Sequence, residues 1–352
     1  MPTIPCTADH LRVQALRAPQ RVAVEESGVA LSYGDLDLLV RRCRRELRSL
    51  GLRAGSRVAV AGDGCALGPQ LVVLLAAESL GCTTASVAGN DDYSRAVLAA
   101  MEHLFTAVPI TVPAPVQVHA LDAAFVQRWS SGEADEPGAE LQPQQPARLA
   151  STSGTTGQPR LLLLPHALLD WRIRTVMELP GWDHGPGTRL LVLAPLVVNA
   201  GYLRLSGALR RGGTVVAGRA AAIASLAPTH IQGLPAQLAR FLDELPAGYA
   251  SPRRVEVGTF GGRVGAALAD GVRAAFGSEV ENRYGTNETS TVCAAMDARA
   301  TGTLEAGVAV RILDGQGREL PPGVEGRIAV RSPAMVDGYH GDAQATAAAF
   351  RD

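Results

Sequence analysis

The sequence predicts an α/β fold, in which layered βαβ sheets are flanked by helices and a small β-barrel-like part follows at the C-terminal end. Two observations support the layered sheets: apolar runs of strand length alternate with segments of helix length, and this order recurs along the chain. A third supports the last part, because after Thr303 short β-rich runs are separated by Gly and Pro turns. With 352 residues, 47% of them hydrophobic, the chain can bury a large core.

The first βαβ unit follows an amphipathic helix. Apolar residues recur at steps of three and four from Leu36 to Leu50, and Ser32 is a candidate N-cap. A β-rich run at 57–61, an apolar helix-length segment at 67–80 and a second β-rich run at 83–87 then predict strand, helix and strand.

The same order returns twice later in the chain. The segments are 190–193, 201–211 and 214–216, and then 255–258, 264–276 and 280–282. We therefore expect one large domain over 1–352, with a first α/β part at 1–129, a linker-like excursion at 130–147, a second α/β part with the binding site at 148–302, and the barrel-like part at 303–352. The excursion is expected because Ser, Gly, Glu, Pro and Gln interrupt the rhythm there.

Charge and cysteine content restrict the function classes. The 33 basic and 34 acidic residues give a net charge of -1, so we expect neither nucleic acid nor a membrane as partner. Five cysteines without a CxxC pair predict reduced thiols. The first residues lack a signal-peptide pattern and the apolar runs are too short to span a bilayer, which predicts a cytoplasmic protein. All the basic residues are Arg, and Lys is absent.

The segment with the clearest chemistry is Ser151-Thr152-Ser153-Gly154-Thr155-Thr156-Gly157-Gln158-Pro159-Arg160. Hydroxyls and the unobstructed backbone N–H groups of a Gly-rich loop can surround a polyphosphate, and Arg160 adds a cationic fork for phosphate oxygens. The spacing is not that of a Walker A loop, which disfavours a P-loop kinase or GTPase. A flexible surface loop is the alternative that composition alone leaves open.

This loop resembles the signature Thr-Ser-Gly-Thr-Thr-Gly-x-Pro-Lys-Gly of the adenylate-forming superfamily, with Arg160 in place of Lys and Leu161 in place of Gly. The superfamily includes acyl- and aryl-CoA synthetases and the adenylation domains of nonribosomal peptide synthetases. Further segments resemble its motifs in the same order. They are Leu31-Ser32-Tyr33-Gly34-Asp35-Leu36, Phe260-Gly261-Gly262-Arg263, Asn282-Arg283-Tyr284-Gly285-Thr286-Asn287-Glu288-Thr289, Gly323-Val324-Glu325-Gly326-Arg327-Ile328 and Asp337-Gly338-Tyr339.

The resemblance implies an ATP site with Mg²⁺ as cofactor. Tyr284 would stack on adenine with Asn282 near its amino edge, Glu288 would hold Mg²⁺, and a carboxylate suits that ion. Asn287 replaces a Thr beside the α-phosphate, so its role is open. The implied ATP-binding residues are Thr152, Ser153, Gly154, Thr155, Thr156, Gly157, Gly262, Asn282, Tyr284 and Gly285, and the implied catalytic residues are Glu288, Asn287 and Arg160.

It also implies a pocket for a carboxylic acid. Asn199 stands where amino-acid-activating members carry an Asp, and a neutral amide cannot form an ion pair with an α-ammonium, so an aryl or short acyl acid is favoured. The other lining residues would be Ala200, Leu203, Thr259, Gly261, Arg283, Thr291 and Val292. We expect Arg283 to point outward to solvent rather than to pair with a second anionic or polar substituent of the substrate.

The implied activity is ATP-dependent conversion of the acid into an acyl-adenylate with release of pyrophosphate, before transfer to coenzyme A or to the phosphopantetheine of a carrier protein. The superfamily's small C-terminal domain, with its reaching Lys, is expected to be absent from this chain, which would impair catalysis. Truncation is the favoured explanation, and a natural protein that keeps only the large domain is the alternative. The alternatives are an amino-acid-activating adenylation domain and a non-catalytic domain that binds nucleotide or acid.

Overall fold

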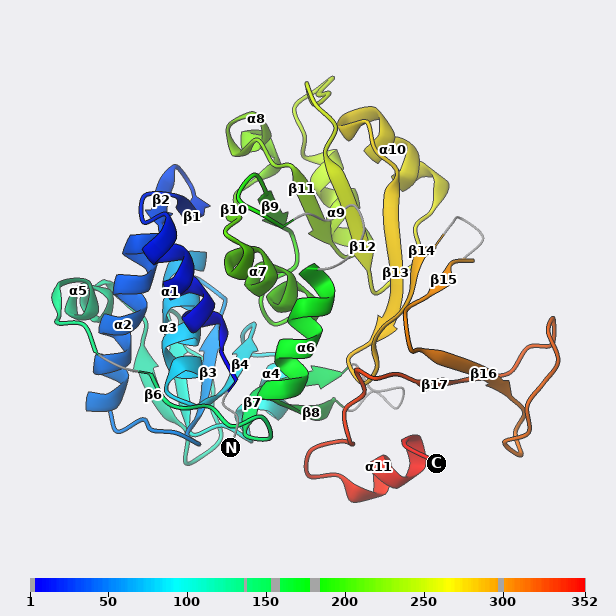
Figure 1. Ribbon diagram of the computed structural model, residues 1–352, viewed down its shortest axis with the longest axis horizontal. Helices are drawn as coiled ribbons and strands as arrows, with labels where there is room; N and C mark the ends of the chain where they lie inside the picture. Colours follow the sequence, from blue (N-terminus) through cyan, green and yellow to red (C-terminus); the bar gives the residue numbers. More distant parts are fainter. Residues whose placement is uncertain (1–3, 136–137, 153–158, 178–183, 297–300, 352) are drawn as a thin grey trace.

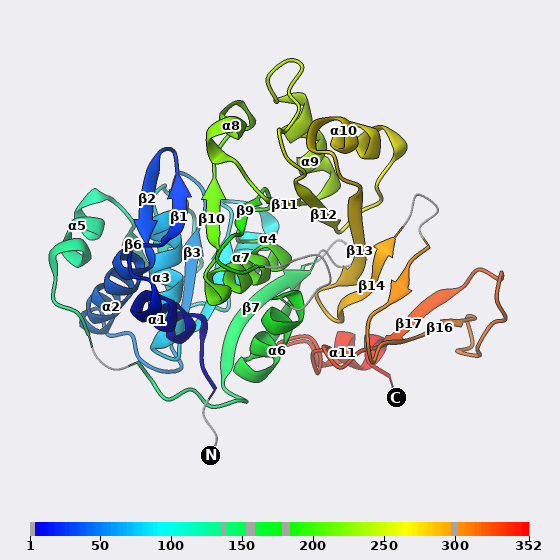
Figure 2. The same cartoon turned by 45° about the horizontal axis from the view of Figure 1, so that its top comes forward.

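The computed structural model describes residues 4–135, 138–152, 159–177, 184–296 and 301–351. Two α/β units lie side by side, and a thin β-ribbon and the last helix extend from one side of the molecule (Figure 1). Figure 2 shows the same arrangement from a second direction. The layered α/β fold predicted from the sequence is confirmed.

The first unit is built on a six-stranded sheet with the order β6-β5-β3-β4-β7-β8, in which all neighbours are parallel except β7 and β8. Its strands are β3 (Arg57–Ala61), β4 (Thr83–Val87), β5 (His103–Thr106), β6 (Gln117–Ala120), β7 (Pro146–Thr152) and β8 (Arg160–Pro165). All five residues of β4 are buried, as expected for a central strand of a parallel sheet. The strands predicted at 57–61 and 83–87 are confirmed.

The second unit is built on a nine-stranded sheet with the order β15-β14-β13-β12-β11-β9-β10-β1-β2. The strands from β13 to β1 are parallel, and β2, β14 and β15 are added antiparallel at the two edges. The strands are β1 (Val22–Glu26), β2 (Val29–Ser32), β9 (Arg189–Val192), β10 (Thr214–Ala217), β11 (His230–Gly233), β12 (Glu256–Phe260), β13 (Val280–Thr286), β14 (Ser290–Met296) and β15 (Thr303–Leu304).

Helices connect the strands. They are α1 (Thr7–Arg17), α2 (Tyr33–Ser49), α3 (Leu67–Ser79), α4 (Asp92–Leu98), α5 (Ala123–Ser131), α6 (His166–Met177), α7 (Asn199–Arg211), α8 (Ile223–Leu226), α9 (Pro235–Asp243), α10 (Ala266–Phe276) and α11 (Ala343–Ala349), with a 3₁₀ turn at Ala220–Ala222. Of these, α1, α2, α3, α6 and α7 pack against one another. The predicted N-cap is confirmed, because Ser32 Oγ accepts a hydrogen bond from Asp35 N at 3.1 Å. Helix α1 contacts α2, α3 and α7, so one apolar core joins the two units.

The C-terminal part differs from the barrel-like piece expected after Thr303. In the described residues it is a two-stranded antiparallel ribbon of β16 (Ala309–Leu313) and β17 (Arg327–Arg331). Strand β15 pairs with β14 in the large sheet instead. Two strands cannot close into a barrel, so the barrel expectation is wrong for this part of the chain.

The 130–147 stretch is attached to the first unit where the structure describes it. Ala139 N donates to Ser79 O at 2.8 Å, and Asp135 forms an ion pair with Arg44 at 3.1 Å. Leu141 is buried in the main core.

Within the described ranges, no helix has both the length and the apolar character needed to cross a bilayer.

Candidate nucleotide and acid site

The expected phosphate loop joins two antiparallel strands. Thr152 at the end of β7 pairs with Arg160 at the start of β8. Ser153, Gly154, Thr155, Thr156 and Gly157 lie outside the described residues. The Thr152 hydroxyl is buried and has no hydrogen-bond partner among the described atoms. A buried polar atom without a partner is costly, so this hydroxyl at the base of the loop is available to a ligand oxygen.

Arg160, Tyr339 and Glu288 form a cluster beside the loop. The guanidinium carbon of Arg160 lies 4.8 Å from the centre of the Tyr339 ring, and the Tyr339 hydroxyl donates to Glu288 Oε1 at 3.0 Å. Burial raises the pKa of Tyr339, which keeps its hydroxyl protonated as a donor. Oε2 of Glu288 makes no hydrogen bond within the described structure, so this carboxylate has one oxygen free for a cation.

Arg172 on α6 holds the turn that carries Asn287 and Glu288. It is 1% exposed and donates to Ala334 O (2.6 and 3.1 Å), Asn287 O (2.9 Å) and Glu288 O (3.1 Å). Burial lowers its pKa to about 10, so the side chain remains cationic at neutral pH. The sequence analysis missed this positioning residue, although a charge in a largely apolar helix was a usable signal.

Asn287 connects the same turn to the phosphate loop. Its Nδ2 donates to Ser151 O at 2.8 Å, one residue before Thr152. The β13–β14 turn and the end of β7 are 136 residues apart in the chain, and this bond fixes their relative position. The expected catalytic residues Asn287, Glu288 and Arg160 therefore lie together.

The residues expected to bind the base lie on β13 and beside it. Asn282 accepts from Thr259 Oγ1 at 3.0 Å and donates to Gly262 O at 3.2 Å. Tyr284 is 37% exposed, so its ring is accessible for stacking. A Cβ on Gly285 would lie 2.3 Å from Ser290 O, so only glycine fits where β13 meets β14.

The register of β12 and β13 separates two sets of side chains. Thr259 pairs with Asn282, and Phe260 pairs with Arg283. Because successive side chains point to opposite faces of a sheet, Phe260 shares a face with Arg283, whereas Thr259 shares one with Asn282. Thr259 and Arg283, both expected to line the acid pocket, therefore lie on opposite faces of the sheet. Gly261, which follows, is exposed and has a positive φ of 77°.

Asn199 begins α7 and contacts a buried cation. Arg148 Nε donates to Asn199 Oδ1 at 3.3 Å, and Arg148 Nη2 donates at 3.0 Å to both Ser86 Oγ and Leu196 O. The guanidinium carbon lies 3.6 Å from the centre of the Tyr202 ring. Because Arg148 occupies the amide oxygen, Asn199 has its amide N–H groups left to donate. Ala200 and Leu203 follow on the same helix, half-buried and buried respectively.

Arg283 does not point to solvent. It is 5% exposed and forms ion pairs with Glu281 and, at 3.2 Å, with Glu305. The outward expectation is wrong because a carboxylate two residues along β13 and another beyond β15 compensate the charge inside the fold. Thr291 and Val292 lie on the neighbouring strand β14, where Thr291 pairs with Gly285.

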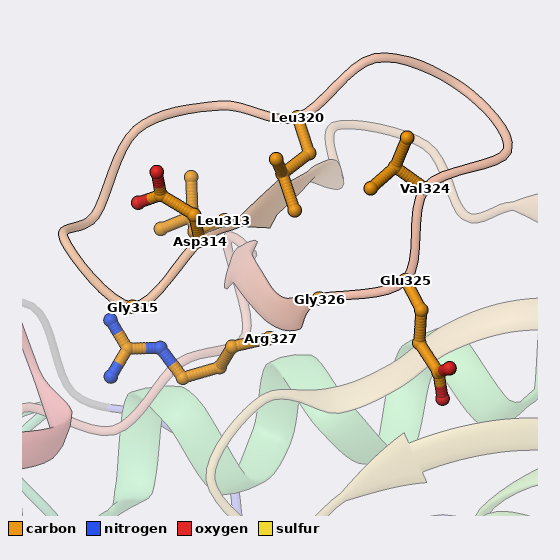
Figure 3. Close-up of a pocket in the computed structure, with 8 residues that line it drawn as sticks. All are labelled: Leu313, Asp314, Gly315, Leu320, Val324, Glu325, Gly326 and Arg327. Carbon is orange, nitrogen blue, oxygen red and sulfur yellow. The ribbon is translucent and has the colours of Figure 1, made fainter.

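Two hollows lie elsewhere in the described structure. One of about 270 Å³ lies between the carboxyl ends of β3 and β4 in the first sheet and those of β9 and β10 in the second, and Ser86 and Leu196 line it. The other, of about 450 Å³, is on the loop of the β16–β17 ribbon (Figure 3). None of the residues expected to bind ATP or acid lines either hollow.

Known proteins resemble this chain in sequence and fold. The chain is 30% identical to phosphinothricin tripeptide synthetase PhsB of Streptomyces viridochromogenes over 97% of its own length, but it spans only 30% of that protein. It is 31% identical to a feruloyl-CoA synthase of Amycolatopsis over 96% of this chain and 72% of the relative. The crystal structure of VinN superposes with a TM-score of 0.83 and 19% identity over 100% of this chain and 94% of VinN, which supports the fold. The profile of the AMP-binding enzyme family matches residues 11–340, and the chain belongs to this family, within the adenylate-forming superfamily.

Proposed function

We propose that this chain supplies the ATP- and acid-binding part of an enzyme that activates a carboxylic acid. A carboxylate oxygen of the acid attacks the α-phosphorus of ATP, the bond to pyrophosphate breaks, and an acyl-adenylate forms. A thiolate then attacks the acyl carbon and AMP leaves. ATP and the acceptor thiol of such a reaction are supplied in the cytoplasm, where we expect the protein to act.

One observation carries the proposal. Thr152, whose hydroxyl has no partner among the described atoms, pairs with Arg160 across β7 and β8, and Arg160 and Glu288 both contact Tyr339. A hydroxyl donor, a cation and a carboxylate are the groups needed for polyphosphate with Mg²⁺. Glu288 would hold the ion, which would neutralise the charge that develops on the phosphates.

Within this chain, each group has a defined task. Arg160 balances charge on phosphate oxygens, and Thr152 donates its hydroxyl proton to one of them. Tyr339 orients the carboxylate of Glu288 by occupying one of its oxygens. Tyr284 offers a ring face to the base.

The favoured acid is aryl or short acyl. Asn199, with its oxygen occupied by Arg148, offers N–H donors to a substrate oxygen and no charge to an α-ammonium. The name of the feruloyl-CoA synthase supports an aryl acid and coenzyme A, whereas another relative, fatty acid–[acyl-carrier-protein] ligase ScoC of Streptomyces coeruleorubidus, supports a carrier protein as acceptor. The similarity to PhsB keeps amino-acid activation as the second candidate.

Calorimetry of this chain with ATP and Mg²⁺ tests the proposal. We expect binding, lost or weakened at least tenfold in Glu288→Gln and in Thr152→Val, because each substitution removes one phosphate-side group. Glu279→Gln is the matched control, since that carboxylate is 71% exposed and lies on the surface. A wild-type chain that binds no nucleotide, or variants that bind as well as the wild type, would contradict this assignment.

A further inference from the structure

Arg204 is the exception among the buried arginines of the described structure. Six arginines there are at most 5% exposed, and five of them make two or more hydrogen bonds to carboxylates, carbonyls or side chains; the six are Arg44, Arg148, Arg172, Arg204, Arg210 and Arg283. Arg204 makes one, a 3.4 Å bond from Nη1 to Ala200 O, and its Nε has no partner. A guanidinium carries five donors, so most of the hydrogen-bonding capacity of this one is unused.

Among the described residues, no carboxylate forms an ion pair with Arg204, although the charge of Glu281 on β13 favours its cationic form. Arg283 lies nearby on β13 and adds a like charge. The two carboxylates that contact Arg283, Glu281 and Glu305, both form ion pairs with it. The other neighbour is the Phe260 ring, whose centre is 4.6 Å from the guanidinium carbon. Burial, followed by the charge of Arg283, lowers the pKa of Arg204 to about 9, so the side chain is still cationic at neutral pH.

Arg204 lies next to residues that are expected to line the acid pocket, Ala200 and Arg283. Arg204 is one turn after Ala200, so both lie on the same side of α7. Its other neighbours, Phe260 and Arg283, share the face of β12 and β13 opposite to Asn282. An anion bound here is therefore neither a phosphate of ATP nor the carboxylate that attacks it.

We propose that Arg204 binds a second carboxylate, carried on the tail of the acid that this site activates. The inference rests on the proposed function and names its substrate class: dicarboxylic acids. The planar guanidinium can donate two parallel hydrogen bonds to a carboxylate, and the Phe260 ring excludes water from one side of the pair. The ligand thereby pairs with a charge that has no ion-pair partner among the described residues.

A ligand-binding arginine and a structural arginine at position 204 predict different effects on the thermal stability of the ligand-free protein. A buried cation without a partner opposes folding, so Arg204→Met should leave the thermal stability of the ligand-free chain unchanged or raise it. A structural role predicts the opposite, a clear fall in melting temperature. Arg211→Met is the matched control, because Arg211 is on the same helix but exposed.

The binding experiment compares acids that differ only in the second carboxylate. Glutarate and its monomethyl ester, and isophthalate and its monomethyl ester, are titrated calorimetrically into the chain with a non-hydrolysable ATP analogue and Mg²⁺. We expect whichever diacid binds more tightly to bind at least about tenfold more tightly than its own monomethyl ester, because the ester loses a charged hydrogen-bonded pair with Arg204. Arg204→Met should abolish the difference, Arg204→Lys should retain part of it, and Arg211→Met should leave it intact.

The outcomes separate this proposal from the proposed function. Esters that bind as tightly as the diacids, or a diacid preference that survives in Arg204→Met, would overturn the second-carboxylate subsite and leave acid activation standing. If the ATP analogue and every acid fail to bind, the proposed function fails and the subsite fails with it.

Discussion

Replacing Arg172 with methionine removes the cation that holds the Asn287–Glu288 turn. Methionine keeps most of the apolar stem, so the change deletes hydrogen bonds more than volume. Three carbonyl oxygens lose a donor. Glu288 O keeps one, because Val336 N also donates to it at 3.0 Å, whereas Ala334 O and Asn287 O are left without a donor in the described structure.

The size of the effect follows from these two orphaned carbonyls. A buried acceptor without a donor costs about 1–3 kcal/mol, which gives roughly 2–6 kcal/mol for two. Part of this is offset because the buried guanidinium is itself poorly solvated, as its pKa of about 10 indicates. We expect a net loss of about 3 kcal/mol in the free energy of unfolding, within the range for breaking a buried charged network. Affinity for ATP with Mg²⁺ should fall as well, because Glu288 lies on the released turn.

Urea unfolding at pH 7 measures the change in the free energy of unfolding, and calorimetry measures the affinity for ATP with Mg²⁺. Arg172→Lys should be intermediate, since an ammonium keeps the charge but cannot span the same carbonyls. Arg174→Met, two residues along the helix, is the control: Arg174 is 54% exposed in its side chain and should change stability by less than about 0.5 kcal/mol. An Arg172→Met chain as stable as that control would refute the assignment of Arg172 as the residue that holds this turn.

Three further substitutions test other parts of the site and core. Gly285→Ala should cost roughly 2–4 kcal/mol by thermal unfolding, because the new Cβ would lie 2.3 Å from Ser290 O on the backbone of β14; a mild effect would contradict the close approach of the strands. His166 is buried and its pKa is lowered to about 4 by burial, so the unfolded chain, with a pKa near 6.5, binds more protons between those values. Stability should therefore fall as pH decreases from about 6.5 to 4, by up to about 3 kcal/mol, and His166→Asn should flatten the dependence seen in urea unfolding. Asn199→Asp alone should not confer amino-acid binding in calorimetry, because Arg148 would pair with the new carboxylate, whereas the double variant with Arg148→Met should; binding by the single variant would show that Arg148 does not control this position.

Local sequence patterns were sufficient for the βαβ units. Strands β3 and β4 begin and end where the β-rich runs 57–61 and 83–87 were predicted, because small and β-branched residues favour a strand that is buried on both faces. The barrel-like expectation failed for a non-local reason. Whether the short Thr303–Leu304 strand joins a barrel or the edge of the large sheet depends on a pairing with β14, which no spacing within the segment specifies.

In the candidate site, too, local motifs were informative and contacts between distant residues were not predicted. Asn287 and Glu288 were predicted as site residues because their neighbours in the chain form a recognisable motif. The motifs could not show that Arg283 is buried, because an isolated arginine in a strand normally indicates a solvated face and one compensating carboxylate, Glu305, lies 22 residues away. The orientation of Asn199 depends in the same way on Arg148, 51 residues earlier.

Two of the buried cations show why arginine suits their positions better than lysine would. Burial takes the pKa of Arg172 to about 10 and that of Arg204 to about 9, and both side chains stay charged at neutral pH. A lysine begins near 10.4, about two pH units below arginine, so the same environments would bring it to roughly 7–8 and leave it partly neutral. An ammonium also lacks the planar fork needed to bind several carbonyls or both oxygens of a carboxylate. Arginine therefore suits both interior positions: one where the cation is saturated by the protein and holds a turn, and one where it is left unsaturated and a ligand completes it.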